Sequence, residues 1–206
     1  KMFKRWLYVF SVVLLMVPMV QPLLPVELLD GGSEIISDKI SDSEKIVIDG
    51  SLEESIWKNP PIKEAFITMA PTFGVVVKDP IEVWAAYDEN NLYFAFKCYD
   101  EQPDQIKTSV AQRDKIENDD QVGVWIDTAG TQQSSYEFYI NPNGIQMDGI
   151  NSSVSRADYT PDFVWQSAGK LDAEGYSVEV CIPLESIRYQ VNKNNESKMR
   201  VMFFRK

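Results

Sequence analysis

The sequence contains no histidine among its 206 residues. This absence excludes serine–histidine–aspartate and cysteine–histidine catalysis, and it excludes every zinc site that uses imidazole. Only two cysteines are present, which is too few for a four-thiolate site. A metal bound by this chain is therefore expected to be a hard cation held by oxygen ligands, with calcium as the first candidate.

Basic residues are few, because 20 lysines and arginines stand against 31 aspartates and glutamates and give a net charge of −11. A surface of this sign excludes a nucleic-acid partner, since phosphate binding needs a basic surface. It also argues against docking on anionic lipid through the folded part. Hydrophobic residues make up 44% of the chain and charged residues 25%, which is the composition of a foldable domain.

Long helical periodicity and internal repeats are both missing. Short apolar runs with period-two alternation, separated by tight turns, fill the chain instead. They predict an all-β fold, an antiparallel β-sandwich with one or two short helical turns. Asn143-Gly144 between two such runs is a strong hairpin signal. The expected strands cover residues 46–50, 81–87, 92–100, 122–127, 136–141, 145–151, 163–171, 176–183 and 199–204.

Two short segments predict single helical turns. Ser51 offers an N-cap with Glu54 three residues later, which is a capping box for a turn that carries Ile56 and Trp57. We expect Trp57 to plug one end of a sheet as part of the core. The second turn is expected at residues 184–187.

Residues 1–29 have the order of an export signal, with a basic start followed by the apolar run Trp6 to Val20. A secretory signal peptide is one interpretation. An uncleaved signal anchor is the other, because prolines follow the run without a clear cleavage site. Both predict an exported protein that is periplasmic, outer-membrane-associated or extracellular.

The rest of the chain divides into a linker and one domain. Residues 30–45 are polar, lack periodicity and are expected to form the linker. The sandwich is expected to occupy residues 46–206. We expect it to be truncated at its C-terminal end, since the last apolar run stops without a cap or a turn.

A disulfide between Cys98 and Cys181 is allowed in an exported domain. The parities of the two residues fit a bridge poorly. Cys98 shares a face with Phe96, whereas Cys181 falls between the apolar positions Val180 and Ile182. Two separate buried thiols are therefore favoured, with the bridge as the alternative.

The segment Arg113 to Thr128 organises the expected functional site. It opens with a loop rich in carboxylates and continues into a strand whose Val122, Val124 and Ile126 face the core. The opposite face of that strand carries the indole of Trp125. An acidic loop that leads into such a strand suits a sugar or a cation, and it equally suits the solvated rim of an ordinary sandwich.

Tyr139 and Glu137 have the same non-core parity in the next expected strand. If the two strands pair, Trp125 and Tyr139 form a platform of the kind that holds the C–H faces of a pyranose. Alternatively, this face packs against a second sheet layer or a missing domain. Arg113 stands beside the acidic loop in a position to orient it. The candidate carbohydrate-binding residues are Trp125, Tyr139, Glu137, Asp120 and Arg113.

Five phrases together resemble the family-9 carbohydrate-binding modules over about residues 45 to 204. They are IVIDGSLEESIWKNP, YDENNLYFAFKCYD, RDKIENDDQVGVWIDT, YEFYINPNGIQMDG and GYSVEVCIPLESIRY. The match looks closest to the version at the amino end of exported bacterial proteins whose larger carboxyl part is predicted to be an outer-membrane barrel. The resemblance implies a β-sandwich, often with bound calcium, that binds a poly- or oligosaccharide in a secreted or envelope setting.

The sequence departs from the sugar-binding pattern of that family. Sugar-binding members have a tryptophan three residues before the aspartate that opens the central strand, and a glutamate three residues after it. With Asp120 as that aspartate, the matching positions hold Glu117 and Gly123. The ligand arginine of the next strand falls at Tyr139. The second stacking tryptophan of the family belongs to a segment beyond Lys206.

Three functions compete at this stage. The first is a non-catalytic carbohydrate-binding domain associated with polysaccharide catabolism. The second is an envelope protein-interaction or scaffold module that precedes an outer-membrane barrel and has no sugar site. The third is a glycoside hydrolase with paired carboxylates such as Asp119 and Asp127. Catalysis by this chain is not expected, because acids are plentiful and no pair stands out.

Calcium has three candidate positions, all in acidic turns. They are Asp88 to Asn91, Asp100 to Asp104, and Asp119-Asp120. None has the fixed ligand spacing of an EF-hand, so the calcium site is a hypothesis.

Overall fold

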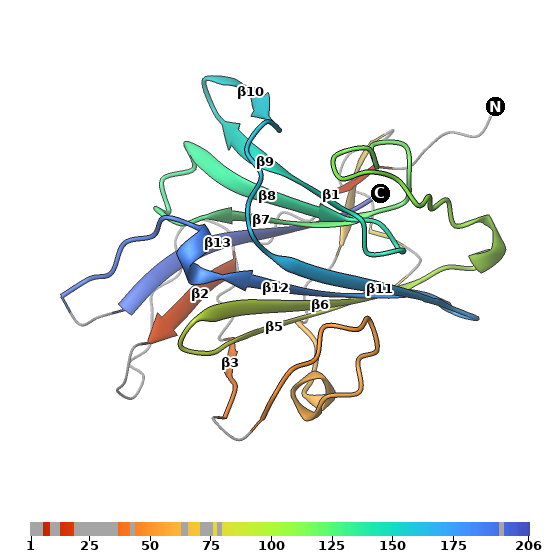
Figure 1. Cartoon of the computed structure of the whole chain (residues 1–206), viewed down its shortest axis with the longest axis horizontal. Coiled ribbons are helices and arrows are strands. Elements are labelled where there is room, and N and C mark those ends of the chain that lie inside the picture. Colours follow the sequence, from red (N-terminus) through yellow and green to blue (C-terminus); the bar gives the residue numbers. More distant parts are fainter. Residues whose placement is uncertain are drawn as a thin grey trace.

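A computed structural model describes residues 6–8, 13–18, 37–41, 44–62, 66–70, 76–77, 80–193 and 196–206. Two β-sheets lie face to face in this part of the chain, as Figure 1 shows. The predicted all-β antiparallel sandwich is confirmed. The described residues contain short 3₁₀ turns and no longer helix: η1 (Ser55–Lys58), η2 (Pro103–Gln105) and η3 (Leu184–Ser186).

The larger sheet has eight strands in the order β10-β9-β8-β7-β13-β1-β4, with β2 also paired to β13. All of its neighbouring strands are antiparallel. The β9–β10 hairpin projects beyond the rest of the sheet (Figure 1). The strands are β1 (Trp6–Tyr8), β2 (Val13–Pro18), β4 (Ile67–Ala70), β7 (Val122–Asp127), β8 (Ser134–Ile140), β9 (Gln146–Ser152), β10 (Ser155–Asp158) and β13 (Glu196–Arg205).

The smaller sheet has five strands in the order β11-β12-β6-β5-β3. Its neighbours are antiparallel except for β3 and β5, which run parallel. β3 lies within the segment that we expected to be a linker, and Ile40 beside it is buried. The strands are β3 (Asp38–Lys39), β5 (Ile81–Tyr87), β6 (Asn91–Tyr99), β11 (Gln166–Asp172) and β12 (Gly175–Pro183).

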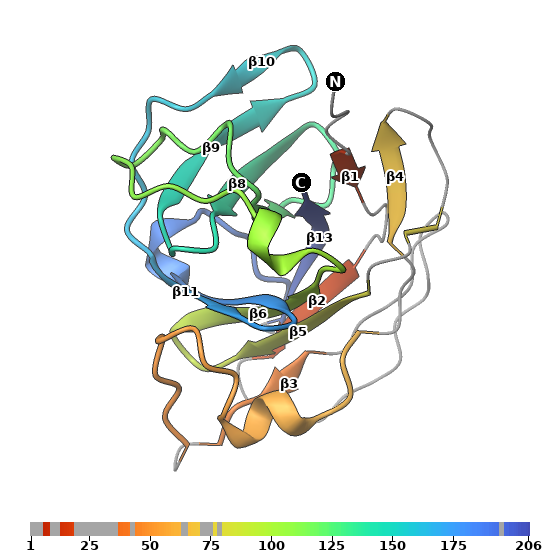
Figure 2. The same cartoon turned by 90° about the vertical axis from the view of Figure 1, so that its right-hand side faces the viewer.

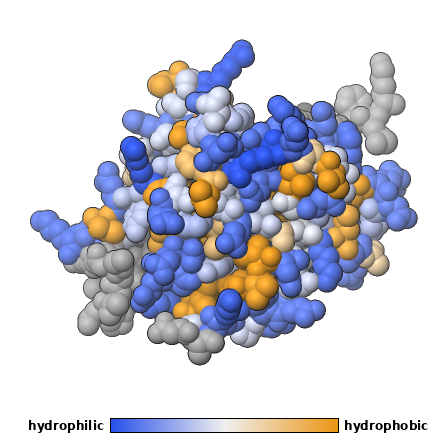
Figure 3. Space-filling model, in the orientation of Figure 1, coloured by the Kyte–Doolittle hydropathy of each residue, from blue (hydrophilic) through white to orange (hydrophobic). Residues whose placement is uncertain are grey.

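The main core fills the space between the two sheets. Phe203 of β13 packs edge-to-face against Phe94 and Phe96 of β6, with ring centroids 5.9 and 5.8 Å apart. The valine and isoleucine positions of β7 face the same space. Alternation along each strand therefore buries one face of each sheet, as expected. The view in Figure 3 shows the complementary result, a largely hydrophilic surface with separate apolar patches.

The segment 44–62 covers the far side of the five-stranded sheet, at the bottom of Figure 2. Glu179 of β12 is fully buried there and accepts hydrogen bonds from the amides of Asp49 (3.0 Å) and Gly50 (2.8 Å). The indole Nε1 of Trp57 donates to the other carboxylate oxygen at 2.8 Å. Burial raises the pKa of Glu179, and these three donors lower it. Trp57 is buried as predicted, but it packs on the far face of the five-stranded sheet rather than over one end of it.

Two local predictions in this segment are wrong. Residues 46–50 form no strand: the amides of Asp49 and Gly50 bond to the Glu179 side chain, and the amide of Val47 bonds to Glu54, instead of to a neighbouring strand. The capping box is also absent. The turn η1 begins one residue after Glu54, without a side-chain cap, and Glu54 instead accepts a hydrogen bond from the amide of Val47 at 3.2 Å.

Cys98 and Cys181 are both free and buried. Cys98 belongs to the core between the sheets, whereas Cys181 packs under segment 44–62 on the opposite face. The prediction of two separate thiols is confirmed, because the five-stranded sheet stands between them.

The predicted export segment, residues 1–29, lies mostly outside the described residues. Its two described pieces, β1 and β2, pair with β13. Among the described residues no helix is long and apolar enough to cross a membrane. Export stays a prediction.

Candidate functional site

The face of the eight-stranded sheet that turns away from the core carries the candidate site, and we call it the outer face. The register of β7 and β8 places Trp125 opposite Glu137, and Gly123 opposite Tyr139. On the other side of β7, β13 places Phe204 opposite Gly123. The structure therefore brings three of the five predicted residues, Trp125, Glu137 and Tyr139, together on one face.

The rings of Trp125 and Tyr139 meet edge-to-face rather than as a flat platform. Their centroids are 6.3 Å apart and their planes cross at 82°. Tyr139 is only 5% exposed, and its ring also meets Phe204 edge-on at 5.5 Å. Trp125 keeps part of its surface open. The stacking surface on β7 is thus Trp125 alone, with Tyr139 as its buried support.

Glu137 is a buried acid, with 1% of its surface exposed. Its Oε2 accepts hydrogen bonds from the hydroxyls of Tyr139 (3.0 Å) and Tyr159 (2.9 Å). Burial raises the pKa of Glu137, and hydrogen bonds from Tyr159, Tyr139 and Asn151 lower it. Glu137 therefore holds two aromatic residues in fixed positions on the outer face.

Tyr159 is a site residue that sequence reasoning missed. It follows β10, is 40% exposed, and lies with its ring centroid 6.4 Å from that of Tyr139. Gly149 of β9 makes this approach possible, since a Cβ there would lie 2.6 Å from Cδ1 of Tyr159. A glycine inside an alternating strand indicates that another group approaches the backbone closely. Gly149 was therefore the sequence signal that could have pointed to a residue such as Tyr159.

The loop of residues 106–121, which we call the covering loop, covers one end of the outer face. Ile116, fully buried, packs there with Tyr139, Met147 and Phe204. Ala111 from the same loop adds to this cluster. The predicted alternative was a second sheet layer or a missing domain, whereas the cover at this end is a loop of the chain itself. Trp125 and Tyr159 are the partly exposed aromatic residues that remain beside it.

Asp120 does not join the outer-face group. Its carboxylate accepts a hydrogen bond from the amide of Lys107, and the Asp120 amide donates to the Lys107 carbonyl at 2.7 Å. Burial raises the pKa of Asp120 above its ordinary value. The hydrogen bond from the Lys107 amide and the nearby charge of Arg205 act in the opposite direction but are smaller effects. Asp120 therefore fastens the covering loop to the start of β7.

Arg113 also lies apart from that group, and it forms a latch between three segments. Its guanidinium bonds to the buried Asp148 of β9, to Gln146 Oε1 at 2.7 Å and to the Phe163 carbonyl at 2.7 Å. Its Nε lies 3.3 Å from the exposed Asp162. Arg113 was expected to orient the acidic loop, whereas its contacts fasten the chain before β7 to β9 and to the segment before β11.

The remaining acids near β7 are engaged in local structure. Asp119 Oδ2 accepts hydrogen bonds from the hydroxyl and the amide of Ser109 and from Asn141. Asp127 accepts hydrogen bonds from three backbone amides of the turn after β7. Each carboxylate thus stabilises a loop through its hydrogen bonds.

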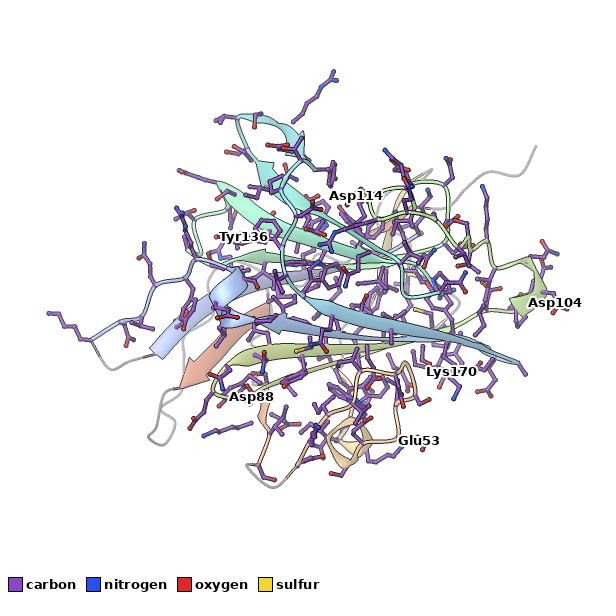
Figure 4. The ribbon with its side chains drawn as sticks, in the orientation of Figure 1. Glu53, Asp88, Asp104, Asp114, Tyr136 and Lys170 are labelled. Atoms are coloured by element: carbon purple, nitrogen blue, oxygen red, sulfur yellow. The ribbon has the colours of Figure 1, made fainter. Side chains whose placement is uncertain are left out.

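The three acidic turns do not form one cluster: the Asp88 turn lies apart (Figure 4), whereas Asp100 lies close enough to Asp120 for its negative charge to raise the pKa of Asp120. Figure 4 places Asp88 and Asp104 toward opposite ends of the molecule. Asp88 accepts hydrogen bonds from the amides of Asn90 and Asn91 and from the hydroxyl of Tyr93. The described part of the chain holds no group of three acidic or cysteine side chains arranged for a metal ion. Calcium stays a prediction.

Comparison with known proteins places this fold in context. The family model described as "Carbohydrate family 9 binding domain-like" matches residues 48–205. No curated protein matches the chain. A solved structure from Bacteroides uniformis ATCC 8492 has 11% identity and a TM-score of 0.51, over 63% of this chain and 64% of that one. The chain therefore spans less than two thirds of that protein.

Two further solved structures are of a family-9 carbohydrate-binding module from Caldicellulosiruptor kristjanssonii. The complex with cellotriose has 18% identity and a TM-score of 0.52, over 81% of this chain and 83% of that one. The complex with glucose has 19% identity and a TM-score of 0.49, over 80% and 85%. At this identity the cellotriose complex supports the fold.

Proposed function

The chain belongs to the carbohydrate family 9 binding domain-like family, and on this premise we propose that it binds a poly- or oligosaccharide without catalysing a reaction. The observation that carries the proposal is the arrangement on the outer face. Trp125 and Tyr159 are partly exposed on either side of the buried Tyr139, and Glu137 fixes both tyrosines.

The chemistry of such a face suits a sugar ring. An indole packs against the C–H face of a pyranose, while hydroxyls of the sugar bond to polar groups at the edge of the contact. Tyr159 offers a ring at that edge, and its hydroxyl, which donates to Glu137, can accept a hydrogen bond from a sugar hydroxyl. The related module from Caldicellulosiruptor kristjanssonii was solved with cellotriose, which supports a glycan as the ligand class.

The assignment as a binding domain also rests on the acids. Asp119 and Asp127 stabilise their own loops through hydrogen bonds. Neither is placed to share the acid and base steps of hydrolysis. We include in the proposal an exported or envelope location and a structural calcium ion, which are predictions from the sequence and its family resemblance. A rise in melting temperature on adding calcium, reversed by a chelator, is the expected result for the ion.

The test is glycan binding by the full chain. We expect affinity electrophoresis against neutral soluble glucans, with calorimetry on cellotriose, to detect binding. Trp125→Ala should weaken it roughly 2- to 10-fold, the effect of losing one aromatic contact. Trp125→Phe keeps a ring and should retain most of the affinity. Leu171→Ala, an exposed position on β11, is the matched control.

Two results would count against this function. One is the absence of binding by the wild type to any glycan tested. The other is an equal loss of affinity in Trp125→Ala and Leu171→Ala, because their positions lie on different sheets. Melting temperatures of all variants separate lost binding from lost folding.

A second function has one observation in its favour. Tyr139 and Gly123 occupy the positions where the resemblance expects an arginine and a glutamate, and the Tyr139 ring fills the space above Gly123. A scaffold module that precedes an outer-membrane barrel would need no sugar clamp. Its signature is stable association with the envelope fraction that Trp125→Ala leaves unchanged, with no glycan binding by the isolated chain.

A further inference from the structure

Arg200 of β13 lies on the outer face close to Trp125. The register places Arg200 opposite Asp127, and Met202 opposite Trp125. Residues directly opposite each other in a sheet share a face, and so do residues two apart along a strand. Arg200 and Trp125 are therefore diagonal neighbours, a relationship that spans about 7–8 Å and is within reach of long side chains.

The guanidinium of Arg200 has no partner among the described residues. Its Nη1 is buried without a hydrogen bond, and the side chain forms no ion pair there. Within the described part of the chain, Arg113 and Arg205 also have one buried guanidinium nitrogen without a hydrogen bond, but each forms an ion pair, Arg113 with Asp148 and Arg205 with Asp100. A buried guanidinium nitrogen without an acceptor is costly, and it calls for an explanation such as a bound ligand.

Asp127, the cross-strand neighbour, does not supply that acceptor. Its Oδ1 accepts hydrogen bonds from the amides of Ala129 (3.1 Å) and Gly130 (2.9 Å), and its Oδ2 accepts one from Gln132 (2.6 Å). Lys198, two residues before Arg200 and exposed, adds a second cation with the same parity. Lys198 and Arg200 thus place two cations on the β13 side of the outer face, beside the carboxylate of Asp127.

We propose that Arg200 binds the carboxylate of a hexuronate residue whose ring packs on Trp125. This inference rests on the proposed carbohydrate-binding function and names the sugar class. A planar guanidinium matches a carboxylate through two parallel hydrogen bonds, which distinguishes a uronate from a neutral hexose. The net charge of −11 opposes an acidic polymer at long range. Moderate salt screens that repulsion more than it screens a partly buried contact.

The test compares one polymer with and without its charge. De-esterified polygalacturonate and its fully methyl-esterified form share a backbone, and we expect the wild type to bind the charged form more tightly. Arg200→Gln should lose roughly ten- to hundredfold in affinity for the charged form and nothing for the ester. Arg200→Lys keeps the charge and should lose less. Arg156→Gln, an exposed arginine on β10, is the matched control and should behave as wild type.

Each of the contrary results below contradicts either the uronate assignment alone or the proposed carbohydrate-binding function as well. The uronate assignment is overturned if the wild type binds both polymers equally or does not bind polygalacturonate. The proposed carbohydrate-binding function still stands in that case, provided that the wild type binds a neutral glucan. An Arg200-dependent preference for a sulfated glycan over polygalacturonate replaces carboxylate by sulfate and overturns the uronate assignment as well. Loss in Arg156→Gln equal to that in Arg200→Gln indicates a general charge effect. If the wild type binds no glycan at all, both the uronate assignment and the proposed function are wrong.

Discussion

The ring of Tyr139 lies directly over Gly123 on the neighbouring strand. A Cβ added at Gly123 would stand 2.7 Å from Cδ1 and 3.0 Å from Cε1 of that ring. The two residues are therefore complementary, since the missing side chain of one provides the space for the other. Together they close the centre of the outer face, where the family resemblance expects a glutamate and an arginine.

Gly123→Ala should destabilise the fold by roughly 1–3 kcal/mol, because the added methyl overpacks against a buried ring. Urea unfolding measures the change. The double variant Gly123→Ala with Tyr139→Leu should lose less than the sum of the single variants, with a coupling above about 0.5 kcal/mol. Strict additivity would show that the two side chains do not compete for this space.

Glu137→Gln should change how stability depends on pH. Burial raises the pKa of Glu137 above its ordinary 4.5, so the folded protein holds the proton more tightly than the unfolded chain does. The resulting stabilisation is complete below about the ordinary value and is lost as the pH rises through the raised pKa. The unfolding free energy of the wild type should therefore fall relative to that of Glu137→Gln over this window.

Denaturant unfolding at a series of pH values gives the comparison. Glu117→Gln, an exposed glutamate on the covering loop, controls for the loss of one negative charge. A difference between wild type and Glu137→Gln that grows in the opposite direction would contradict the expected sign.

Trp57→Phe should cost more stability than Trp84→Phe. Both indoles donate one hydrogen bond of 2.8 Å, Trp57 to the buried Glu179 and Trp84 to the Asn59 carbonyl at an exposed position. Removing the first leaves a buried carboxylate oxygen without its donor, at a cost of roughly 1–3 kcal/mol. Water replaces the second donor, so we expect less than about 1 kcal/mol there. Equal losses in urea unfolding would mean that Glu179 does not anchor segment 44–62.

Arg113→Met should destabilise the protein by roughly 3 kcal/mol, because it leaves the buried Asp148 without its counter-charge. Arg156→Met, at an exposed position on β10, should stay within about 0.5 kcal/mol. Adding Asp148→Asn to Arg113→Met should recover part of the loss, since the uncompensated charge is then gone. If the two arginine variants unfold at similar midpoints, Arg113 does not hold its three segments together more strongly than an exposed arginine would.

The sequence by itself determined the strands and their faces. Period-two alternation is a local property, so β5 to β9, β12 and the shared parity of Trp125, Glu137 and Tyr139 could be read from neighbouring residues. The same reasoning correctly separated the two cysteines. It failed at residues 46–50, where Glu179, about 130 positions away, accepts hydrogen bonds from the amides of Asp49 and Gly50.

Only the tertiary structure decided what covers the outer face and what remains open. Three features join segments that are separated along the chain: the covering loop, the contact of Tyr159 with Gly149, and the ion pair of Arg113 with Asp148. Parity tells which way a side chain points, but not which distant segment meets it. Burial, and with it the difference between the buried support Tyr139 and the partly open Trp125, follows from those long-range contacts.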